Sequence, residues 1–139
     1  MGAYLETFRS MVSPAELDHL SHMNAQYYFA AVGSGITAFQ IELGLTPSDM
    51  REGRRLAFAA VHGDTNFRAE LKAGDVIRLD TAVTEIGNKT ATFHHRLFNV
   101  EKQALSCETH LKCVLMNLDK RRAVEIPEDV KEALRKYLI

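Results

Sequence analysis

Apolar residues recur at helical spacing between residues 24 and 44, and this is the strongest pattern in the chain. Steps of three and four residues separate the members of one continuous stripe, which are Phe29, Val32, Ile36, Phe39 and Leu43. Further apolar residues widen the stripe over most of the helix circumference. The pattern therefore predicts a helix of about twenty residues that is enclosed by other structure. Ser21 or Asn24 can cap its start, and Gly44 can end it.

Two glycines, Gly33 and Gly35, stand in the middle of this helix, where each costs about 1 kcal/mol relative to alanine. We expect them to allow close packing of the helix on a sheet. Two other interpretations stay open. One is a groove along the helix for a substrate tail, and the other is a break into two shorter helices at Gly33.

Alternation of apolar and polar residues predicts strands before and after the helix. A short strand is expected within 4–12, followed by long strands at 56–71, 76–86, 89–100 and 104–116. Each long strand should have one packed face and one more polar face. In the strand at 89–100, the face expected to pack carries Ala91, Phe93, His95 and Leu97. The opposite face carries Thr92, His94, Arg96 and Phe98.

The remaining segments connect or flank these elements. Gly63 predicts a bulge or a close backbone approach within its strand. Residues 46–55 are expected to form a surface loop, and residues 120–122 a solvated basic turn. Pro127 opens a short terminal helix that should pack on an outer surface. The economical arrangement is an α+β fold, with one antiparallel sheet wrapped around one long central helix.

The length of 139 residues suits a single domain, 1–139. The net charge is −1 and the chain mixes acidic and basic residues, so the charge does not indicate binding to nucleic acid or to a membrane surface. No apolar run reaches the ~18 residues of a membrane span, and no signal-peptide core precedes the first strand.

Cys107 and Cys113 lie roughly 20 Å apart along one strand, too far for a disulfide. We therefore expect buried, reduced cysteines and a cytoplasmic protein.

A polar run, residues 18–24, stands where the long helix should begin. The N-terminus of a helix favours negative charge because its first N–H groups lack intrahelical acceptors. A carboxylate there, Asp18, can attack a carbonyl or activate water, while the free N–H groups hold the resulting oxyanion. The alternative is that Asp18 merely caps the helix.

Other catalytic arrangements find less support. His19 and His22 could bind a metal with Asp18, but no complete ligand set with metal-site spacing is visible, so we expect no metal and no cofactor. His94 and His95 point to opposite faces of a strand and cannot share an ion. The serines lack the sequence context of a nucleophile elbow.

The polar run and the order of elements resemble the hotdog fold, in particular the 4-hydroxybenzoyl-CoA thioesterase-like acyl-CoA thioesterases. Members of that branch carry an Asp, two residues, Gly, His, an aliphatic residue and Asn before a helix with an early Tyr. The matching residues here are Asp18, His22, Met23, Asn24 and Tyr27 or Tyr28. Residues 70–75 resemble the turn between the second and third strands of the branch. The sequence departs from the branch at three places. Ser21 stands where the branch has Gly, and Ala25 stands where it has a second Asn. Residues 30–32 stand where the branch often has Glu and Arg along the helix.

The resemblance implies an acyl-CoA thioesterase that hydrolyses a small acyl-CoA thioester. Asp18 would be the nucleophile or general base, and His22 a second catalytic residue. The residues expected to bind substrate are Ser21, Asn24, Tyr27, Gly63 and Asn66. Arg96, Lys112 and residues 120–122 are candidates to meet the CoA phosphates.

The resemblance also implies a homodimer or homotetramer in which two subunits join their sheets. Residues 62–68 of one subunit would then face Asp18 of the other. Two other functions stay open. A hotdog hydratase or dehydratase would use Asp18 with His22 to move a proton, and a non-catalytic module would only bind acyl-CoA.

Overall fold

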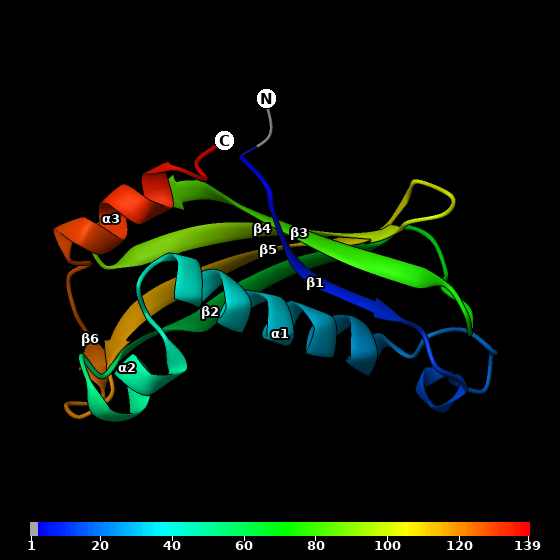
Figure 1. The fold of residues 1–139 in the computed structure, drawn as a ribbon, viewed down its shortest axis with the longest axis horizontal. Coiled ribbons are helices and arrows are strands. Elements are labelled where there is room, and N and C mark those ends of the chain that lie inside the picture. Colours follow the sequence, from blue (N-terminus) through cyan, green and yellow to red (C-terminus); the bar gives the residue numbers. More distant parts are fainter. Residues whose placement is uncertain (1–2) are drawn as a thin grey trace.

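The computed structural model describes residues 3–139 and contains one long, curved antiparallel sheet that wraps around one helix (Figure 1). The strands are β1 Leu5–Met11, β2 Leu56–Phe67, β3 Val76–Ile86, β4 Thr90–Asn99, β5 Ala104–Asn117 and β6 Arg122–Ala123. The helices are α1 Ala25–Glu42, α2 Pro47–Glu52 and α3 Glu128–Arg135, and a 3-10 turn covers Pro14–Glu16. The strand order is β1-β3-β4-β5-β2, with β6 paired to β5. The predicted α+β architecture is confirmed.

The long helix begins and ends at the predicted signals. The side chain of Asn24 accepts a hydrogen bond from the N–H of Gln26 at 3.1 Å, which caps α1. Gly44 follows the helix with φ of +86°, and its N–H binds the carbonyl of Ile41. Of the two predicted caps, Asn24 is therefore the one that is used.

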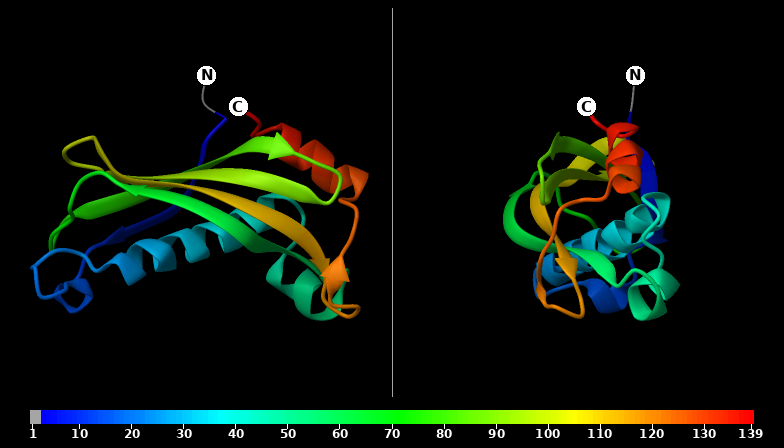
Figure 2. Two further views of the ribbon diagram at one scale, coloured as in Figure 1. Left: turned by 180° about the vertical axis from the view of Figure 1, so that it is seen from behind. Right: turned by 90° about the vertical axis from the view of Figure 1, so that its left-hand side faces the viewer.

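The expectation that α1 is enclosed on nearly all sides is wrong. Tyr28, Val32 and Phe39 face the sheet and are buried, but Phe29 is 51% exposed and Ile41 is 45% exposed. The sheet curves around one side of the helix only, as the end-on view in Figure 2 shows. Apolar residues on the other side of α1 thus remain open in this chain.

The two helix glycines have different environments, and the helix does not break at either of them. A Cβ built on Gly35 would overlap the side chain of Leu79 and would lie 2.9 Å from Oγ1 of Thr7. A Cβ on Gly33 would meet nothing within 4 Å. The prediction of close packing on the sheet is confirmed for Gly35. It is wrong for Gly33, which lies on the exposed side of α1.

A row of polar side chains crosses the concave face of the sheet and divides the hydrophobic core into two parts. Thr81, His95 and Thr109 are opposite one another on β3, β4 and β5. Oγ1 of Thr81 lies 2.8 Å from Nδ1 of His95 and 2.8 Å from Oγ1 of Thr7. Burial lowers the pKa of His95 to about 3. His95 is therefore a neutral core residue, and the predicted packed face of β4 is confirmed.

Two segments that flank β2 differ from their predictions. Residues 46–55 include the short helix α2, because Thr46 accepts a hydrogen bond from the N–H of Asp49 and Pro47 suits the first turn. β2 ends at Phe67 instead of residue 71, where the N–H groups of Arg68 and Ala69 both turn to the carbonyl of Ser106.

The bulge predicted near Gly63 occurs two residues earlier, at a register shift between Ala60 and His62. Gly63 itself lies against the side chain of Leu111, so a close approach is confirmed. The apolar face of the terminal helix α3 does not pack on an outer surface of the sheet, as predicted, but against the core. Its Val130 and Leu134 are fully buried in the core that contains Phe39, because α3 closes the end of the concave face beside α1 (Figure 2).

The cysteines are buried and free, as predicted. Cys107 and Cys113 belong to different parts of the divided core. Burial raises the pKa of Cys107 to about 11 and that of Cys113 to about 12, so both are protonated thiols at neutral pH.

We predict opposite effects of alanine at the two helix glycines. Gly33→Ala should raise the free energy of unfolding by roughly 0.5–1 kcal/mol, because alanine favours the helix and has open space there. Gly35→Ala should lower it by about 1–3 kcal/mol, because the methyl group collides with Leu79 and Thr7. Denaturant unfolding of the matched pair measures both. Equal effects of the two substitutions would contradict the contact at Gly35.

We also predict that thermal stability falls between pH 7 and pH 5. Below the ordinary His value of 6.5 the unfolded chain takes up a proton at residue 95, whereas the folded chain does so only near its pKa of about 3. Each pH unit below 6.5 should therefore cost up to about 1.4 kcal/mol. Burial also lowers the pKa of His94, which adds in the same direction. The melting temperature should change less between pH 7 and pH 5 in His95→Gln than in the parent protein. An equal change in the two proteins would contradict a neutral, buried His95.

Candidate active site

The loop before α1 is fixed by backbone hydrogen bonds at both ends. The N–H of Asp18 donates to the carbonyl of His22 at 2.8 Å, and the N–H of Ser21 donates to the carbonyl of Asp18 at 3.0 Å. The N–H of Met23 donates to the carbonyl of Leu71 at 2.7 Å, which ties the loop to the segment after β2. Ser21 has a φ of +64°, in the left-handed region that glycine adopts most easily. This conformation accounts for the Gly that the resembled branch carries at this position.

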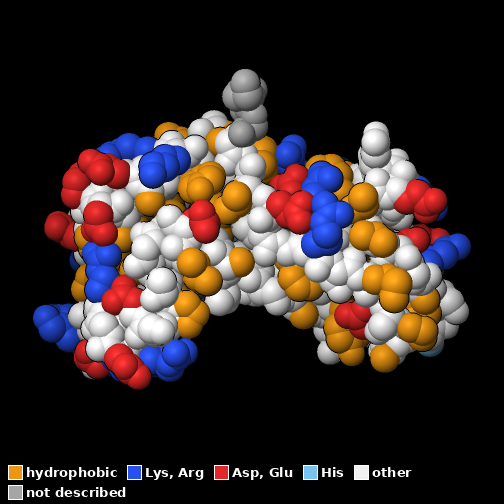
Figure 3. Space-filling view, viewed as in Figure 1, with side chains coloured by type: hydrophobic (Ala, Val, Ile, Leu, Met, Phe, Trp, Pro, Cys, Tyr) orange, Lys and Arg blue, Asp and Glu red, His pale blue; other side chains and the backbone are white. Residues whose placement is uncertain are grey.

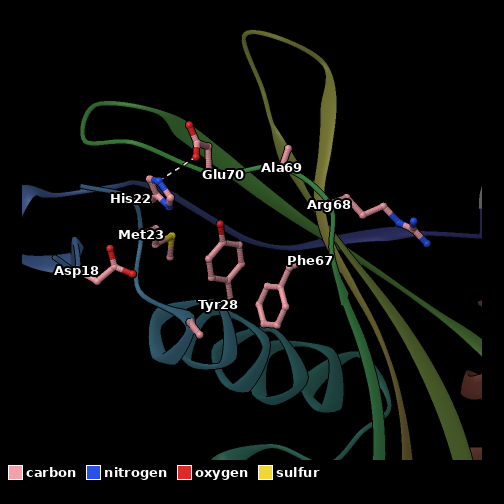
Figure 4. A pocket seen from close by; sticks show the side chains of 9 residues that line it. Asp18, His22, Met23, Tyr28, Phe67, Arg68, Ala69 and Glu70 are labelled. Atoms are coloured by element: carbon pink, nitrogen blue, oxygen red, sulfur yellow. Dashed lines mark ion pairs between the residues drawn. The ribbon is translucent and has the colours of Figure 1, made fainter. Parts of the chain in front are cut away.

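A cavity of about 350 Å³ opens beside this loop (Figure 4). One side is formed by the loop and the first turn of α1, which contribute Asp18, His22, Met23, Ala25 and Tyr28. The other side is formed by Phe67, the last residue of β2, and by residues 68–70, which follow it. The structure thus brings together the two predicted catalytic residues, Asp18 and His22, in one cavity at the N-terminus of α1.

The carboxylate of Asp18 accepts a hydrogen bond from the N–H of Leu20 at 2.8 Å. This hydrogen bond, with the N–H of His22 and the nearby imidazoles, holds the pKa of Asp18 below its ordinary value of 3.8. Asp18 is therefore an anion at neutral pH. It does not cap α1, since Asn24 has that role.

His22 faces a partner that the sequence pattern did not indicate. Its Nε2 lies 2.9 Å from Oε2 of Glu70, an ion pair whenever the imidazole is protonated (Figure 4). The other oxygen of Glu70 lies 3.9 Å from Nζ of Lys72. The pairing could not be found from spacing, because Glu70 reaches the loop only through the backbone contact between Met23 and Leu71.

Two aromatic rings line the inner part of the cavity. Tyr28 is buried, and its hydroxyl points into the cavity between His22 and Ala69 (Figure 4). Burial raises the pKa of Tyr28 to about 12, so the hydroxyl keeps its proton at neutral pH. The ring of Phe67 is perpendicular to that of Tyr28, with 5.3 Å between the ring centroids.

The other residues expected to bind substrate do not line this cavity in the single chain. Ser21 lies on the exposed loop, Asn24 caps α1, and Tyr27 packs partly buried against the core. Gly63 and Asn66 are exposed on β2, the strand at the edge of the sheet. Their roles stay predictions.

The candidates for the CoA phosphates also lie outside the cavity. Arg96 lies on the opposite face of the sheet, where its Cζ is 3.5 Å from the ring centroid of Tyr4. Lys112 and residues 120–122 are exposed. Within residues 3–139, no three His, Cys, Asp or Glu side chains form a cluster that could hold a metal ion. In the same range no helix is both long and apolar enough to cross a membrane.

Comparisons with known proteins show which proteins this chain is similar to. A protein from Agrobacterium fabrum named L-carnitine dehydrogenase/betainyl-CoA thioesterase is 25% identical over 134 residues, which is 94% of this chain. The chain spans about a quarter (26%) of the length of that relative.

Two solved structures show the same fold. A Staphylococcus aureus protein described as hypothetical and solved in complex with CoA has a TM-score of 0.87 at 20% identity, over 99% of this chain and 85% of that one. A 1,4-dihydroxy-2-naphthoyl-CoA thioesterase from Synechocystis has a TM-score of 0.79 at 15% identity, over 92% of this chain and 93% of that one. These likenesses confirm the expected hotdog fold. Because the family model described as the thioesterase-like superfamily matches residues 12–134, the chain belongs to that superfamily.

Proposed function

We propose that this protein is an acyl-CoA thioesterase that hydrolyses a small acyl-CoA thioester to the free acid and CoA. The observation that supports this most directly is the ionised carboxylate of Asp18 in a cavity at the N-terminus of α1. Membership of a thioesterase-like superfamily agrees with a thioester as substrate. The thioester carbonyl would lie between Asp18 and the first turn of α1.

Asp18 supplies the reactive carboxylate in this proposal. As general base it takes a proton from water while the water oxygen bonds to the carbonyl carbon, and the carbonyl oxygen becomes an oxyanion. Collapse of that intermediate breaks the C–S bond, and the CoA thiolate takes up the proton. As nucleophile, Asp18 itself bonds to the carbonyl carbon and releases the thiolate, and water then hydrolyses the mixed anhydride. Both routes need the anionic form that the Leu20 N–H favours.

The first turn of α1 would hold the oxyanion. Ala25 lines the cavity, and its N–H, at the start of the helix, has no intrahelical acceptor. The helix dipole adds a favourable potential at the same end. The protonated hydroxyl of Tyr28 is a second donor that points into the cavity. His22 is held toward the cavity by Glu70 and would orient the substrate carbonyl or the water.

We further propose that two chains join through β2. β2 is an edge strand of the sheet. Most of its residues from Ala59 to Phe67 are exposed, with Val61 at 60% and Phe67 at 54%. An exposed apolar edge strand is a template for pairing with another strand. The open side of α1 carries further exposed apolar residues, and Figure 3 shows hydrophobic side chains on this face of the molecule. Pairing through β2 would bring residues 62–68 of one subunit toward Asp18 of the other.

Substitution of Asp18 tests the catalytic role. Asp18→Asn keeps an oxygen that can accept from Leu20 but removes the negative charge, so folding should be retained. We expect turnover of the best acyl-CoA to fall by roughly 10²–10⁴-fold, as for loss of a positioned acid–base group. The assay is thiol release over a panel of acyl-CoA thioesters, with melting temperature measured in parallel.

Asp119→Asn is a matched control, because Asp119 is exposed and pairs with Arg55 outside the cavity. Its turnover should equal that of the parent. A parent rate in Asp18→Asn would rule out the catalytic assignment. A parent protein that binds acyl-CoA without releasing thiol would instead identify a non-catalytic binding module.

Light scattering tests the assembly. We expect a mass of at least two chains at micromolar concentration, where one chain has 15.6 kDa. Val61→Lys should shift the protein toward the monomer, because it places a charge on the proposed pairing edge. Val76→Lys, at the exposed start of β3, is the control and should leave the mass unchanged. A monomer in the parent protein would contradict the shared interface.

A further inference from the structure

A network of polar side chains lies on the convex face of the sheet, on the side away from α1. Oε1 of Glu108 on β5 lies 3.0 Å from Nε2 of His94 on β4, and Nδ1 of His94 lies 2.6 Å from the hydroxyl oxygen of Tyr4. Oε2 of Glu108 accepts a hydrogen bond from Nε of Arg68 at 2.6 Å. Arg68 also lines the cavity. These four residues, here called the outer network, therefore connect the convex face of the sheet to a wall of the cavity.

Glu108 is held from two sides within the outer network. Hydrogen bonds from His94 and Arg68 hold the pKa of Glu108 below its ordinary value, so its carboxylate is an anion at neutral pH. Burial lowers the pKa of His94, whose ring stacks on that of His110 with 4.2 Å between the centroids. A neutral His94 donates from Nε2 to the carboxylate, while its Nδ1 accepts from the hydroxyl of Tyr4. His94 thus fixes the position of Glu108 independently of Arg68.

Arg68 is joined to β5 by both its backbone and its side chain. Its N–H donates to the carbonyl of Ser106 at 2.8 Å, and its guanidinium points away from the cavity (Figure 4). The side chain of Arg68 is 52% exposed, whereas that of Glu108 is 16% exposed. An ion pair at a surface is usually weak because two flexible side chains must be ordered. Here His94 has already ordered the carboxylate, so the pair mainly restrains Arg68.

The same wall of the cavity carries Glu70, which holds His22. Glu70 lies two residues after Arg68, and its side chain points the other way, with Oε2 at 2.9 Å from Nε2 of His22 (Figure 4). Both side chains of this pair are partly exposed, so burial alone does not fix their contact. Its geometry depends on where the backbone of residues 68–70 lies. The contacts of Arg68 with β5 therefore help to set the position of Glu70.

We propose, on the basis of the thioesterase activity proposed above, that Glu108 is a positioning residue for His22. Glu108 restrains Arg68, and Arg68 restrains residues 68–70. Glu70 on that segment then holds the imidazole of His22 toward the cavity. Because Glu108 lies on the convex face, its effect on the reaction passes through the wall. A looser wall would leave His22 less often in the orientation that turnover needs.

Substitutions at both ends of the contact between Glu108 and Arg68 test this coupling. Glu108→Gln keeps the size and an oxygen that can accept from His94, but removes the charge that holds Arg68. We expect kcat for the best acyl-CoA to fall by about three- to fivefold, which corresponds to the stronger ion pairs at protein surfaces. Arg68→Gln should have the same effect. The double variant should be no slower than either single variant, because all three lack the same contact. A fall of roughly tenfold or more in the double variant, as for two independent effects, would overturn the proposal.

NMR of the His22 ring is a second readout, and it needs no substrate. The nitrogen signals of an imidazole report its tautomer and its hydrogen bonds, and they are compared at one neutral pH. Glu70→Gln, which removes the charged partner of His22, gives the reference change. We expect Glu108→Gln and Arg68→Gln to move the His22 signals in the same direction as Glu70→Gln.

Glu128→Gln is the matched control, because Glu128 forms a similar pair with Arg135 on α3 at 2.8 Å. It should leave kcat and the His22 signals unchanged. Unchanged His22 signals in Glu108→Gln, whether or not its melting temperature falls, would overturn the positioning role and leave the thioesterase standing. Changed signals in a protein that releases no thiol from any thioester would overturn the proposed function and leave the link between Glu108 and His22 standing.

Discussion

The close approach of α1 to the sheet at Gly35 is the contact on which the rest of the structure depends. A side chain at this position would collide with Leu79 on β3 and Thr7 on β1. The absence of one lets the helix lie in the concave face, with Tyr28 and Val32 in one part of the core and Phe39 in the other. Packing of these three side chains along α1 sets the direction of the helix axis. Its N-terminus consequently points at the segment that follows β2.

The site depends on that direction together with a small number of backbone hydrogen bonds. The contact between Met23 and Leu71, together with the pair of His22 and Glu70, joins the loop to residues 67–71 and gives the cavity its two walls. One wall supplies the carboxylate of Asp18 and the helix N-terminus. The other supplies Glu70 and Phe67. A carboxylate that accepts backbone N–H groups stays ionised, which suits a base or a nucleophile.

Several features of the chain share one physical origin, which is a sheet that covers only one side of the helix. The exposed Phe29 and Ile41, the exposed edge strand β2 and the half-exposed Phe67 are all consequences of that partial coverage. In contrast, Thr81 and His95 of the polar row are fully buried, with Nδ1 of His95 paired to Thr81 and Nε2 of His95 without a hydrogen-bond partner among the residues that the structure describes. The protein therefore leaves apolar surface open while it encloses a neutral histidine, and the open surface supports the proposed pairing of two chains.

The sequence by itself determined the elements that depend on local signals. The spacing of Phe29 to Leu43, the cap at Asn24 and the positive φ at Gly44 define α1, and alternation in β4 assigns His95 and His94 to opposite faces. The position of Asp18 and His22 beside the N-terminus of α1 could be predicted because the polar run is contiguous with the helix start. Only the tertiary structure decided which side of α1 is covered, and it alone brought Glu70 to His22 and Phe67 to Tyr28. Periodicity indicates whether a segment forms a helix or a strand, whereas such pairings are set by strand order and by the curvature of the sheet, which no local pattern encodes.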